Sequence, residues 1–222
     1  MVRRPLDLSL CLVVGPDDTR GRPVRDVVLA AVAGGATVVQ LRRKDHAARA
    51  FVEEARTLVA ALRPRGVPLI VNDRVDVALA ADADGVHVGQ EDLPVADVRR
   101  LVGERMLVGL SVTSLTEARV LDAALVDYAG VGPVFATASK PDAAPPLGLD
   151  GTRAVCDVLA ARARGLPAVA IGGIGLANAA AVLATGVAGV AVISAICAAD
   201  DPRAAAASLA ALMRGRSAVG GA

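Results

Sequence analysis

Residues 168–193 read AVAIGGIGLANAAAVLATGVAGVAVI, and this stretch contains the pattern that decides the fold. Two short runs of apolar and β-branched residues, at 168–171 and 189–193, flank an Ala-rich segment at 175–184 with helical spacing. Short buried runs that alternate with helical segments are typical of βα units and of a parallel sheet. The stretch therefore predicts a strand, a helix and a second strand parallel to the first.

The same alternation extends along the whole chain. Strands are predicted at Leu10–Val14, Val38–Leu41, Leu69–Asn72, Gly85–Val88, Leu107–Ser111, Tyr128–Gly132, Ala168–Ile171 and Gly189–Ile193. Helices are predicted near 23–33, 47–63, 75–81, 95–101, 114–125, 150–163, 175–184 and 202–213. Eight strand–helix pairs in 222 residues favour a closed (β/α)8 barrel, the TIM-barrel fold of the α/β class. A doubly wound open sheet is the alternative, and in both architectures ligands bind beyond the carboxyl ends of the strands.

Length and composition are consistent with one domain. A chain of 222 residues with 54% hydrophobic content can form one large core, and no linker divides it. We expect a single catalytic barrel over residues 1–214 and a flexible tail at 215–222. The uncharged stretch 179–199 is weakly apolar and is interrupted by Gly186 and Gly189, so a helix, a turn and a strand are favoured over a membrane span.

The charges nearly cancel, and aromatic residues are scarce. The chain has 24 Lys and Arg against 23 Asp and Glu, so no overall field would attract nucleic acid or an anionic membrane. With no Trp, one Tyr and two Phe, it also lacks the stacking surfaces that single-strand binders use. The expected partners are small-molecule substrates, with no nucleic acid and no membrane. The sequence leaves open whether the chain forms a homo-oligomer.

The cysteines and the amino terminus indicate a reducing compartment. Cys11, Cys156 and Cys197 are odd in number and form no C-x-x-C pair, so neither a disulfide framework nor a zinc site is indicated. The amino terminus, MVRRPLD, has charges where a signal peptide would have a long apolar run. We therefore expect a cytoplasmic protein.

An amide and two cations lie at the end of the second predicted strand. Gln40, Arg42 and Lys44 are two residues apart, so they share one face of an extended chain. If that face points into the barrel, they converge at its opening, where diphosphate oxygens would be suitable partners. A solvated basic loop is an equally good interpretation of the two cations. It fits Gln40 less well, because an amide inside a barrel strand is costly unless it is hydrogen-bonded.

Acidic residues follow the third and fourth predicted strands. Asn72 and Asp73 end one strand and Asp92 follows the next, although the first two suit a turn and the last could cap a helix. Two carboxylates on neighbouring strand ends, opposite a cluster of cations, are what a Mg2+ ion bridging to a diphosphate would require. His46 and His87 are interpreted as structural, because neither is paired with a Ser or Cys nucleophile at a recognisable spacing.

The remaining strand ends carry hydroxyl groups and glycines that suit an anion. Ser111 ends the fifth strand, where a helix cap is the simpler interpretation. The long loop at 133–147 is typical of a lid or binding loop, and phosphate-binding barrels commonly hold a monophosphate after strands seven and eight. Candidate anion donors in these places are Thr137, Ser139 and Lys140 in the loop, Gly172 and Gly173 after the seventh strand, and Ile193 and Ser194 after the eighth.

Six segments, in this order, resemble the thiamine-phosphate synthase family over nearly the whole chain, from Leu10 to about Ala206. They are GGATVVQLRRK at 34–44, VNDRVD at 71–76, DGVHVGQED at 84–92, DYAGVGPVF at 127–135, TASK at 137–140 and AIGGI at 170–174. Any one could arise by chance, whereas the six together are highly specific. The resemblance implies a transferase that joins 4-amino-2-methyl-5-(diphosphooxymethyl)pyrimidine to a thiazole phosphate, with Mg2+, and releases pyrophosphate and thiamine phosphate.

The resemblance also implies a role for each matching residue. The pyrimidine diphosphate would be held by Gln40, Arg42, Lys44, Asn72, Ser111 and Lys140, and the metal ion by Asp73 and Asp92. The thiazole phosphate would be held by Thr137, Ser139, Gly173, Ile193 and Ser194. Residues expected to be catalytic are Arg42, Lys44, Ser111 and Lys140. Catalysis would be charge stabilisation of the departing pyrophosphate while the pyrimidine methylene carbon becomes cation-like and is captured by the thiazole nitrogen.

The chain departs from the family pattern at four positions. Arg43 stands where the family often has Glu, Cys11 replaces a frequent aromatic, Ser139 replaces a common Thr, and Thr113 replaces a usual His. None of these changes removes a metal ligand or a cation, so we expect activity to be retained. The fit around the pyrimidine ring is left open.

Two rival functions remain from the sequence. A related barrel isomerises a thiazole carboxylate phosphate, and it would need a catalytic His near the fifth strand but no metal carboxylates. A non-catalytic binder of phosphorylated thiamine precursors would hold ligand without releasing pyrophosphate.

Overall fold

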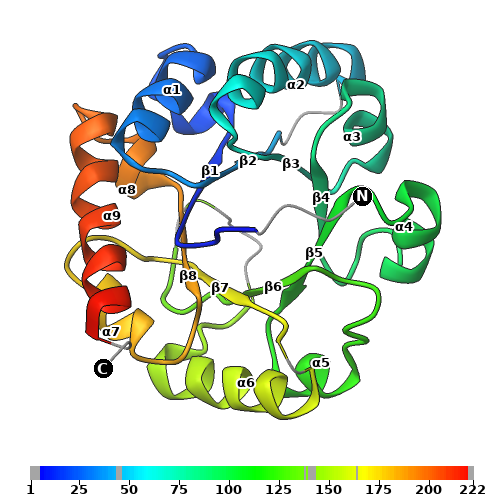
Figure 1. Ribbon diagram of the computed structural model, residues 1–222, viewed down its shortest axis with the longest axis vertical. Helices are drawn as coiled ribbons and strands as arrows, with labels where there is room; N and C mark the ends of the chain where they lie inside the picture. Colours follow the sequence, from blue (N-terminus) through cyan, green and yellow to red (C-terminus); the bar gives the residue numbers. More distant parts are fainter. Residues whose placement is uncertain (1–5, 44–46, 138, 140–143, 164, 220–222) are drawn as a thin grey trace.

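The structure, a computed structural model, is a closed barrel of eight parallel strands surrounded by helices (Figure 1). It describes residues 6–43, 47–137, 139, 144–163 and 165–219. Each strand pairs in parallel with the next along the chain, and β1 pairs with β8 to complete the ring. The predicted (β/α)8 barrel is therefore confirmed, and the open-sheet alternative is wrong.

The apolar runs of the sequence become the strands. They are β1 (Leu10–Val14), β2 (Val38–Leu41), β3 (Leu69–Asn72), β4 (Gly85–Val88), β5 (Leu107–Val112), β6 (Tyr128–Val131), β7 (Ala168–Ile171) and β8 (Gly189–Val192). Three of these ends differ from the prediction by one residue, at β5, β6 and β8. At β8 the reason is that Ile193 leaves the sheet to become the N-cap of the next helix.

Helices connect the strands and cover the outside of the barrel (Figure 1). They are α1 (Val24–Gly34), α2 (Ala48–Leu62), α3 (Val75–Ala81), α4 (Val95–Val102), α5 (Leu115–Val120), α6 (Gly148–Arg162), α7 (Ala179–Leu183), α8 (Ser194–Cys197) and α9 (Pro202–Val219), with 3-10 turns η1 (Pro16–Asp18) and η2 (Arg63–Arg65). Ser114 caps α5 as predicted, because its side chain accepts a hydrogen bond from the amide of Glu117.

Three helices differ from the prediction by four or more residues at one end. Helix α7 begins later because the Asn178 side chain holds a turn, accepting from the Gly175 amide at 2.9 Å and donating to the Gly173 carbonyl at 2.9 Å. Helix α5 ends early because the backbone of Leu121 is extended. Helix α9 continues through residues 215–219, which the sequence places in the tail.

The uncharged stretch at 179–199 contains α7, β8 and α8, so a strand and two short helices share it. Across the ranges that the structure describes, no helix is long and apolar enough to cross a membrane.

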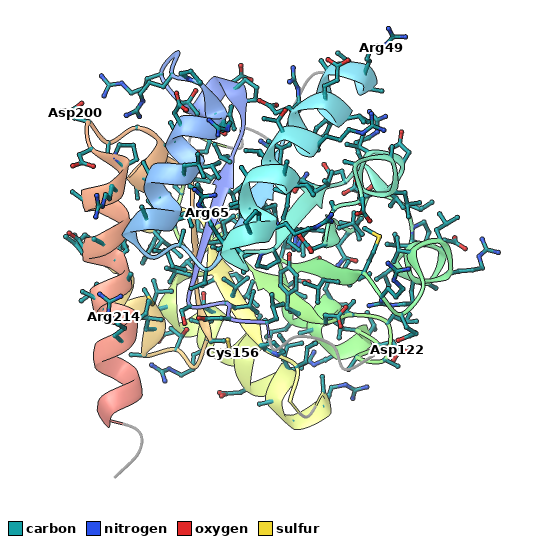
Figure 2. All side chains as sticks on the ribbon, turned by 45° about the horizontal axis from the view of Figure 1, so that its top comes forward. Arg49, Arg65, Asp122, Cys156, Asp200 and Arg214 are labelled. Atoms are coloured by element: carbon teal, nitrogen blue, oxygen red, sulfur yellow. The ribbon has the colours of Figure 1, made fainter. Side chains whose placement is uncertain are left out.

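Two layers of apolar side chains pack against the strands. The larger layer lies between strands and helices, and a smaller one fills the barrel with Leu8, Cys11, Val13, Val38, Ile70, Tyr128, Val169 and Ala191. Charged side chains such as Arg49 and Asp200 point away from the barrel (Figure 2). The interior is therefore a packed core below the strand ends and not a pore.

Two glycines make room inside the barrel for large side chains. A Cβ placed on Gly109 of β5 would collide with the rings of His87 and Tyr128, and one on Gly130 of β6 would lie 2.8 Å from Cε1 of His87. His87 and Tyr128 are both almost fully buried, with 8% and 2% of their residue surfaces exposed. The ring of His87 thus occupies space that the missing side chains of these glycines leave free.

Replacing Gly109 should therefore be costly. We expect Gly109→Ala to lower the free energy of unfolding by about 1–3 kcal/mol, because the added methyl group overpacks the barrel interior. The change is measured from the midpoint of urea unfolding followed by circular dichroism. Gly215→Ala is the matched control, since nothing lies within 4 Å of a Cβ at that position in α9. Equal stability of Gly109→Ala and the wild type would contradict the packing described for His87 and Tyr128.

Candidate functional site at the carboxyl ends of the strands

A cavity of about 480 Å3 lies at the carboxyl ends of the strands, and every strand contributes to its lining. Side chains near its base come from within the strands, such as Cys11, His87 and Tyr128. Those nearer the opening come from the residues that follow them, such as Arg42 and Asp73. This is the end of the barrel at which TIM-barrel enzymes place their active sites.

The structure brings the predicted site residues together. Every one of them within the described part of the chain lines this cavity: Gln40, Arg42, Asn72, Asp73, Asp92, Ser111, Thr137, Ser139, Gly173, Ile193 and Ser194. Gly172, a further candidate anion donor, lines it as well. Lys44 and Lys140 lie outside the described residues, as does His46.

The two arginines after β2 point in opposite directions. Arg42 lines the cavity, and its guanidinium makes no hydrogen bond or ion pair within the part of the chain that the structure describes. Arg43 pairs with Glu54 of α2 at 3.0 Å, and both side chains are largely buried. The departure from the family pattern at Arg43 therefore lies outside the cavity, whereas the five donors of Arg42 are available to an anion.

The acidic strand ends are joined through the backbone. Asp73 has a left-handed conformation with a φ of 62°, and its amide donates to the carbonyl of His87 at 2.7 Å. Two residues beyond His87, the amide of Gly89 donates to Oδ2 of Asp92 at 2.7 Å. Helix α4 has no side-chain cap, so Asp92 does not act as the helix cap that its sequence position allowed.

The two carboxylates fit a hard cation that also binds substrate oxygens. Asp73 and Asp92 are exposed side chains that line one cavity from the ends of adjacent strands. Among the described residues, no group of three or more His, Cys, Asp or Glu side chains could hold a metal ion by itself. Mg2+ needs only one or two carboxylates when water and phosphate oxygens complete its octahedron. The two carboxylates therefore fit a Mg2+ ion that also binds substrate oxygens, and they do not fit a metal site made of protein ligands alone.

Polar side chains in the base of the cavity form a hydrogen-bonded row. Nδ1 of His87 lies 3.0 Å from Oη of Tyr128, and Nε2 of His87 lies 2.9 Å from Oγ of Ser111. Ser111 therefore contacts a histidine and not a helix end. Sequence reasoning missed His87 and Tyr128 as cavity residues, although Gly109 and Gly130 on the neighbouring strands were a signal that large side chains fill the barrel there.

Thr113 occupies the position where the family usually has His. Its hydroxyl donates to Oε1 of Glu117 at 2.9 Å and its amide donates to Oε2 at 2.6 Å. Thr113 and Glu117 both line the cavity. This departure replaces an imidazole by a hydroxyl that is already bonded to a carboxylate.

Loop and helix starts form the opposite wall of the cavity. The loop after β6 is bonded to the end of β7, since the Val134 amide donates to the Ile171 carbonyl at 2.8 Å and the Phe135 amide to the Gly172 carbonyl at 3.0 Å. Thr137 and Ser139 follow in that loop and line the cavity. Hydroxyl groups thus stand beside the glycine turn after β7, in an arrangement suited to a phosphate.

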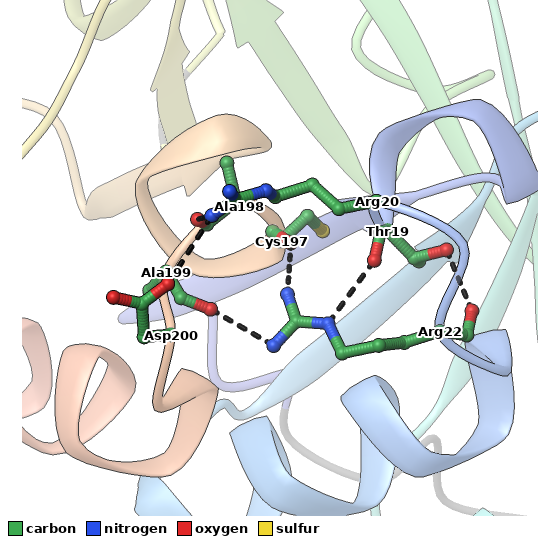
Figure 3. A network of polar contacts seen from close by, with 7 residues as sticks. All are labelled: Thr19, Arg20, Arg22, Cys197, Ala198, Ala199 and Asp200. Atoms are coloured by element: carbon green, nitrogen blue, oxygen red, sulfur yellow. Dashed lines mark hydrogen bonds and ion pairs between the residues drawn. The ribbon is translucent and has the colours of Figure 1, made fainter.

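Helix α8, which begins with Ser194 at the cavity, is held from its other end by the loop after β1 (Figure 3). The Arg22 guanidinium donates to the carbonyl of Cys197, to that of Ala199 at 2.9 Å and to that of Thr19 at 3.1 Å. Arg22 therefore occupies carbonyls at the end of α8 that the helix itself leaves without partners.

Removing this contact should destabilise the fold. We expect Arg22→Ala to lower the free energy of unfolding by about 1–3 kcal/mol, because partly buried carbonyls lose their donors. Arg20→Ala is the control: Arg20 bonds the neighbouring Ala198 carbonyl and Asp200, but its side chain is 62% exposed, so its loss should cost less than about 0.5 kcal/mol. Urea unfolding of both variants measures the difference, and equal losses would contradict this role of Arg22.

Burial keeps the three cysteine thiols and the Tyr128 phenol protonated at neutral pH. It raises the pKa of Cys11 and of Cys197 to about 12, and that of Cys156 to about 11. Burial also raises the pKa of Tyr128 well above its usual range. Because the thiolate and not the thiol is the nucleophile, Cys11 does not provide covalent chemistry at neutral pH although it lines the cavity.

The fold and the cavity define a class of protein: a (β/α)8-barrel enzyme whose strand ends bring an arginine, two carboxylates and several hydroxyl groups to one cavity. Comparison with known proteins names the family. Residues 10–196 match the thiamine monophosphate synthase family, so the chain belongs to that family and is a transferase.

Individual relatives agree with this assignment. The chain is 55% identical to thiamine-phosphate synthase of Chloroflexus aurantiacus over 210 residues, covering 94% of each chain. It is 51% identical to the enzyme of the same name from Xanthobacter autotrophicus over 206 residues, covering 93% of this chain and 95% of the relative. The solved structure of thiamine phosphate pyrophosphorylase from Pyrococcus furiosus is 38% identical, with a TM-score of 0.82 and coverage of 95% and 97%. The family resemblance read from the sequence is confirmed.

Proposed function

We propose that the protein is a thiamine-phosphate synthase that joins 4-amino-2-methyl-5-(diphosphooxymethyl)pyrimidine to 4-methyl-5-(2-phosphooxyethyl)thiazole and releases pyrophosphate. The carboxylated form of the thiazole phosphate is the alternative substrate, and it would also lose CO2. The observation that carries the proposal is that Arg42 faces the same cavity as Asp73 and Asp92, in a chain that belongs to this family. A diphosphate can accept hydrogen bonds from a guanidinium and, with its other oxygens, bind a metal ion that two carboxylates hold.

The pyrimidine diphosphate is assigned to the β2–β5 side of the cavity. Arg42 offers a planar fork of donors that no described side chain occupies, and Asn72 adds an amide on the neighbouring strand. Lys44 and Lys140 belong to this set by family resemblance. The low-dielectric walls of the barrel strengthen each of these contacts relative to bulk water.

A magnesium ion is the cofactor assigned to Asp73 and Asp92. Bound there, it would supply positive charge to the oxygens of the leaving pyrophosphate. The chain's part is to fix the two carboxylates: the amide of Asp73 is tied to β4, and Oδ2 of Asp92 is tied to the amide of Gly89. Asp73 and Asp92 both line the cavity.

The step itself is a dissociative substitution without a protein nucleophile. Arg42 and the two lysines stabilise the negative charge of the pyrophosphate as the bond to the methylene carbon breaks, and the thiazole nitrogen then bonds to that carbon. The thiazole phosphate is assigned to residues of the opposite wall that line the cavity: Thr137, Ser139, Gly173, Ile193 and Ser194. The protonated thiol of Cys11 is consistent with a mechanism that forms no covalent intermediate with the protein.

The geometry favours this function over the tautomerase-like rival, and the assay below addresses the silent binder. A thiazole tautomerase-like barrel needs a catalytic His near the end of the fifth strand, but Thr113 stands there and is bonded to Glu117. A silent binder would also use an arginine and two carboxylates that face the cavity, so product formation separates it from the synthase. Small molecules are the partners that this function needs, and a cytoplasmic location and the homo-oligomer question rest on the sequence alone.

The proposal is tested by product formation. Purified protein is incubated with both substrates and Mg2+, and thiamine phosphate and pyrophosphate are measured together. We expect the two products in equal amounts. Isothermal titration with each substrate, with and without Mg2+, is run alongside. Binding of the pyrimidine diphosphate without any pyrophosphate release would show a binder and would overturn the proposal.

The role of the carboxylates is tested by removing their charge. We expect Asp92→Asn and Asp73→Asn each to lower kcat about a hundredfold to a thousandfold at fixed Mg2+, because the preorganised charge that binds the metal ion is lost. A chelator should abolish the wild-type rate, and added Mg2+ should restore it. Asp97→Asn is the control, since Asp97 pairs with Arg100 on α4 outside the cavity lining. Wild-type turnover in either cavity variant would rule out this metal site.

A further inference from the structure

The loop between β4 and α4, residues 89–94, contains Asp92 and is held by two hydrogen bonds. Within the loop, the Gly89 amide donates to Oδ2 of Asp92 at 2.7 Å. Beyond the loop, Nε2 of Gln90 donates to the backbone carbonyl of Ser111 in β5 at 2.6 Å. The first bond fixes the carboxylate relative to its own loop, and the second fixes the loop relative to the barrel.

The bond from Gln90 is the cross-connection of this loop. Within the ranges that the structure describes, residues 90–93 make no other hydrogen bond to a neighbouring strand. Helix α4 begins only at Val95 and has no side-chain cap that would hold the end of the loop. Without the bond, the loop would be joined to the barrel only through its two chain ends and its packing.

The accepting carbonyl belongs to a part of the barrel that does not depend on the loop. Strand β5 pairs with β4 on one side and with β6 on the other, and Ser111 is opposite Gly130 of β6. The side chain of Ser111 is held as well, because its Oγ lies 2.9 Å from Nε2 of His87. Gln90 therefore ties an exposed loop to a strand end that pairing and packing already fix.

We propose that Gln90 is a positioning residue for the metal ion: its bond to the Ser111 carbonyl holds the loop so that Asp92 can share one cation with Asp73. In this role Gln90 contacts no reacting atom and acts through Asp92. Groups that hold metal ligands in place commonly affect metal affinity strongly. The inference rests on the proposed function and adds to it a residue that sets the affinity for the metal ion.

The experiment removes the bond in two ways. Gln90→Met keeps the length of the side chain without a donor, and Gln90→Asn keeps the amide but is one methylene too short for the Ser111 carbonyl. Binding of Mn2+, a paramagnetic substitute for Mg2+, is titrated on the whole chain by electron paramagnetic resonance. We expect each variant to raise the Kd for Mn2+ about threefold to tenfold, the effect of losing one hydrogen bond.

Kinetics separates positioning from catalysis. In both variants the Mg2+ concentration that gives half the maximal rate should rise by the same factor as the Kd for Mn2+. The kcat at saturating Mg2+ should stay within about twofold of the wild-type value, because both carboxylates remain. A merely structural role of Gln90 would lower the midpoint of urea unfolding and leave the Kd for Mn2+ unchanged.

Leu93→Ala is the matched control from the same loop. Leu93 is next to Asp92 in sequence, is 40% exposed and lies outside the cavity lining, so its loss should leave the Kd for Mn2+ unchanged. A wild-type Kd in either Gln90 variant overturns the inference and leaves the proposed function standing. Absence of Mn2+ binding by the wild type would remove the metal site and the inference together, and thiamine phosphate formation by the same sample shows whether the proposed function also fails.

Discussion

Pairing between the first and the last strand is the constraint on which the rest of the structure depends. Residues 10–12 of β1 pair with residues 190–192 of β8. A Cβ on Gly189 would collide with the carbonyl oxygens of Leu8 and Ser9, so β8 needs a residue without a side chain at this position. Because closure removes both edges of the sheet, the carboxyl ends of all eight strands form one ring. Side chains that are far apart in the sequence then face a common cavity, and no long-range contact other than strand pairing is needed to gather them.

Within that ring, the two-residue period of a strand points consecutive charged side chains in opposite directions. Arg42 faces the cavity, whereas Arg43 faces α2 and pairs with Glu54. The largely buried ion pair holds the end of β2 against its helix, and the neighbouring Arg42 guanidinium faces the cavity. The opposite charge reaches the cavity from β3 and β4, at Asp73 and Asp92. An ion or diphosphate between the two sides would therefore be stabilised by groups that the fold holds in place before the ligand arrives.

The strands could be predicted almost to the residue because each is a short apolar run bounded by polar or glycine-containing turns. The helix ends could not, since they depend on single side chains such as Asn178, whose two hydrogen bonds delay α7. The cavity-lining residues were predictable for a topological reason, as parallel strands all end on one side. What the sequence could not decide was the local alternative at each position: Asp92 bonds the amide of Gly89 and not a helix end, and Ser111 meets His87.

The structural interpretation of His87 was incomplete because it considered only nucleophiles, and its partners come from other strands. A His and a Tyr inside a barrel are unfavourable unless each polar atom is bonded, and an apolar pair could fill the same space without that requirement. Here Gly109 and Gly130 keep that space open for the two rings. The hydrogen-bonded row of Ser111, His87 and Tyr128 lines the cavity, so the space that the two glycines leave open also shapes the cavity base.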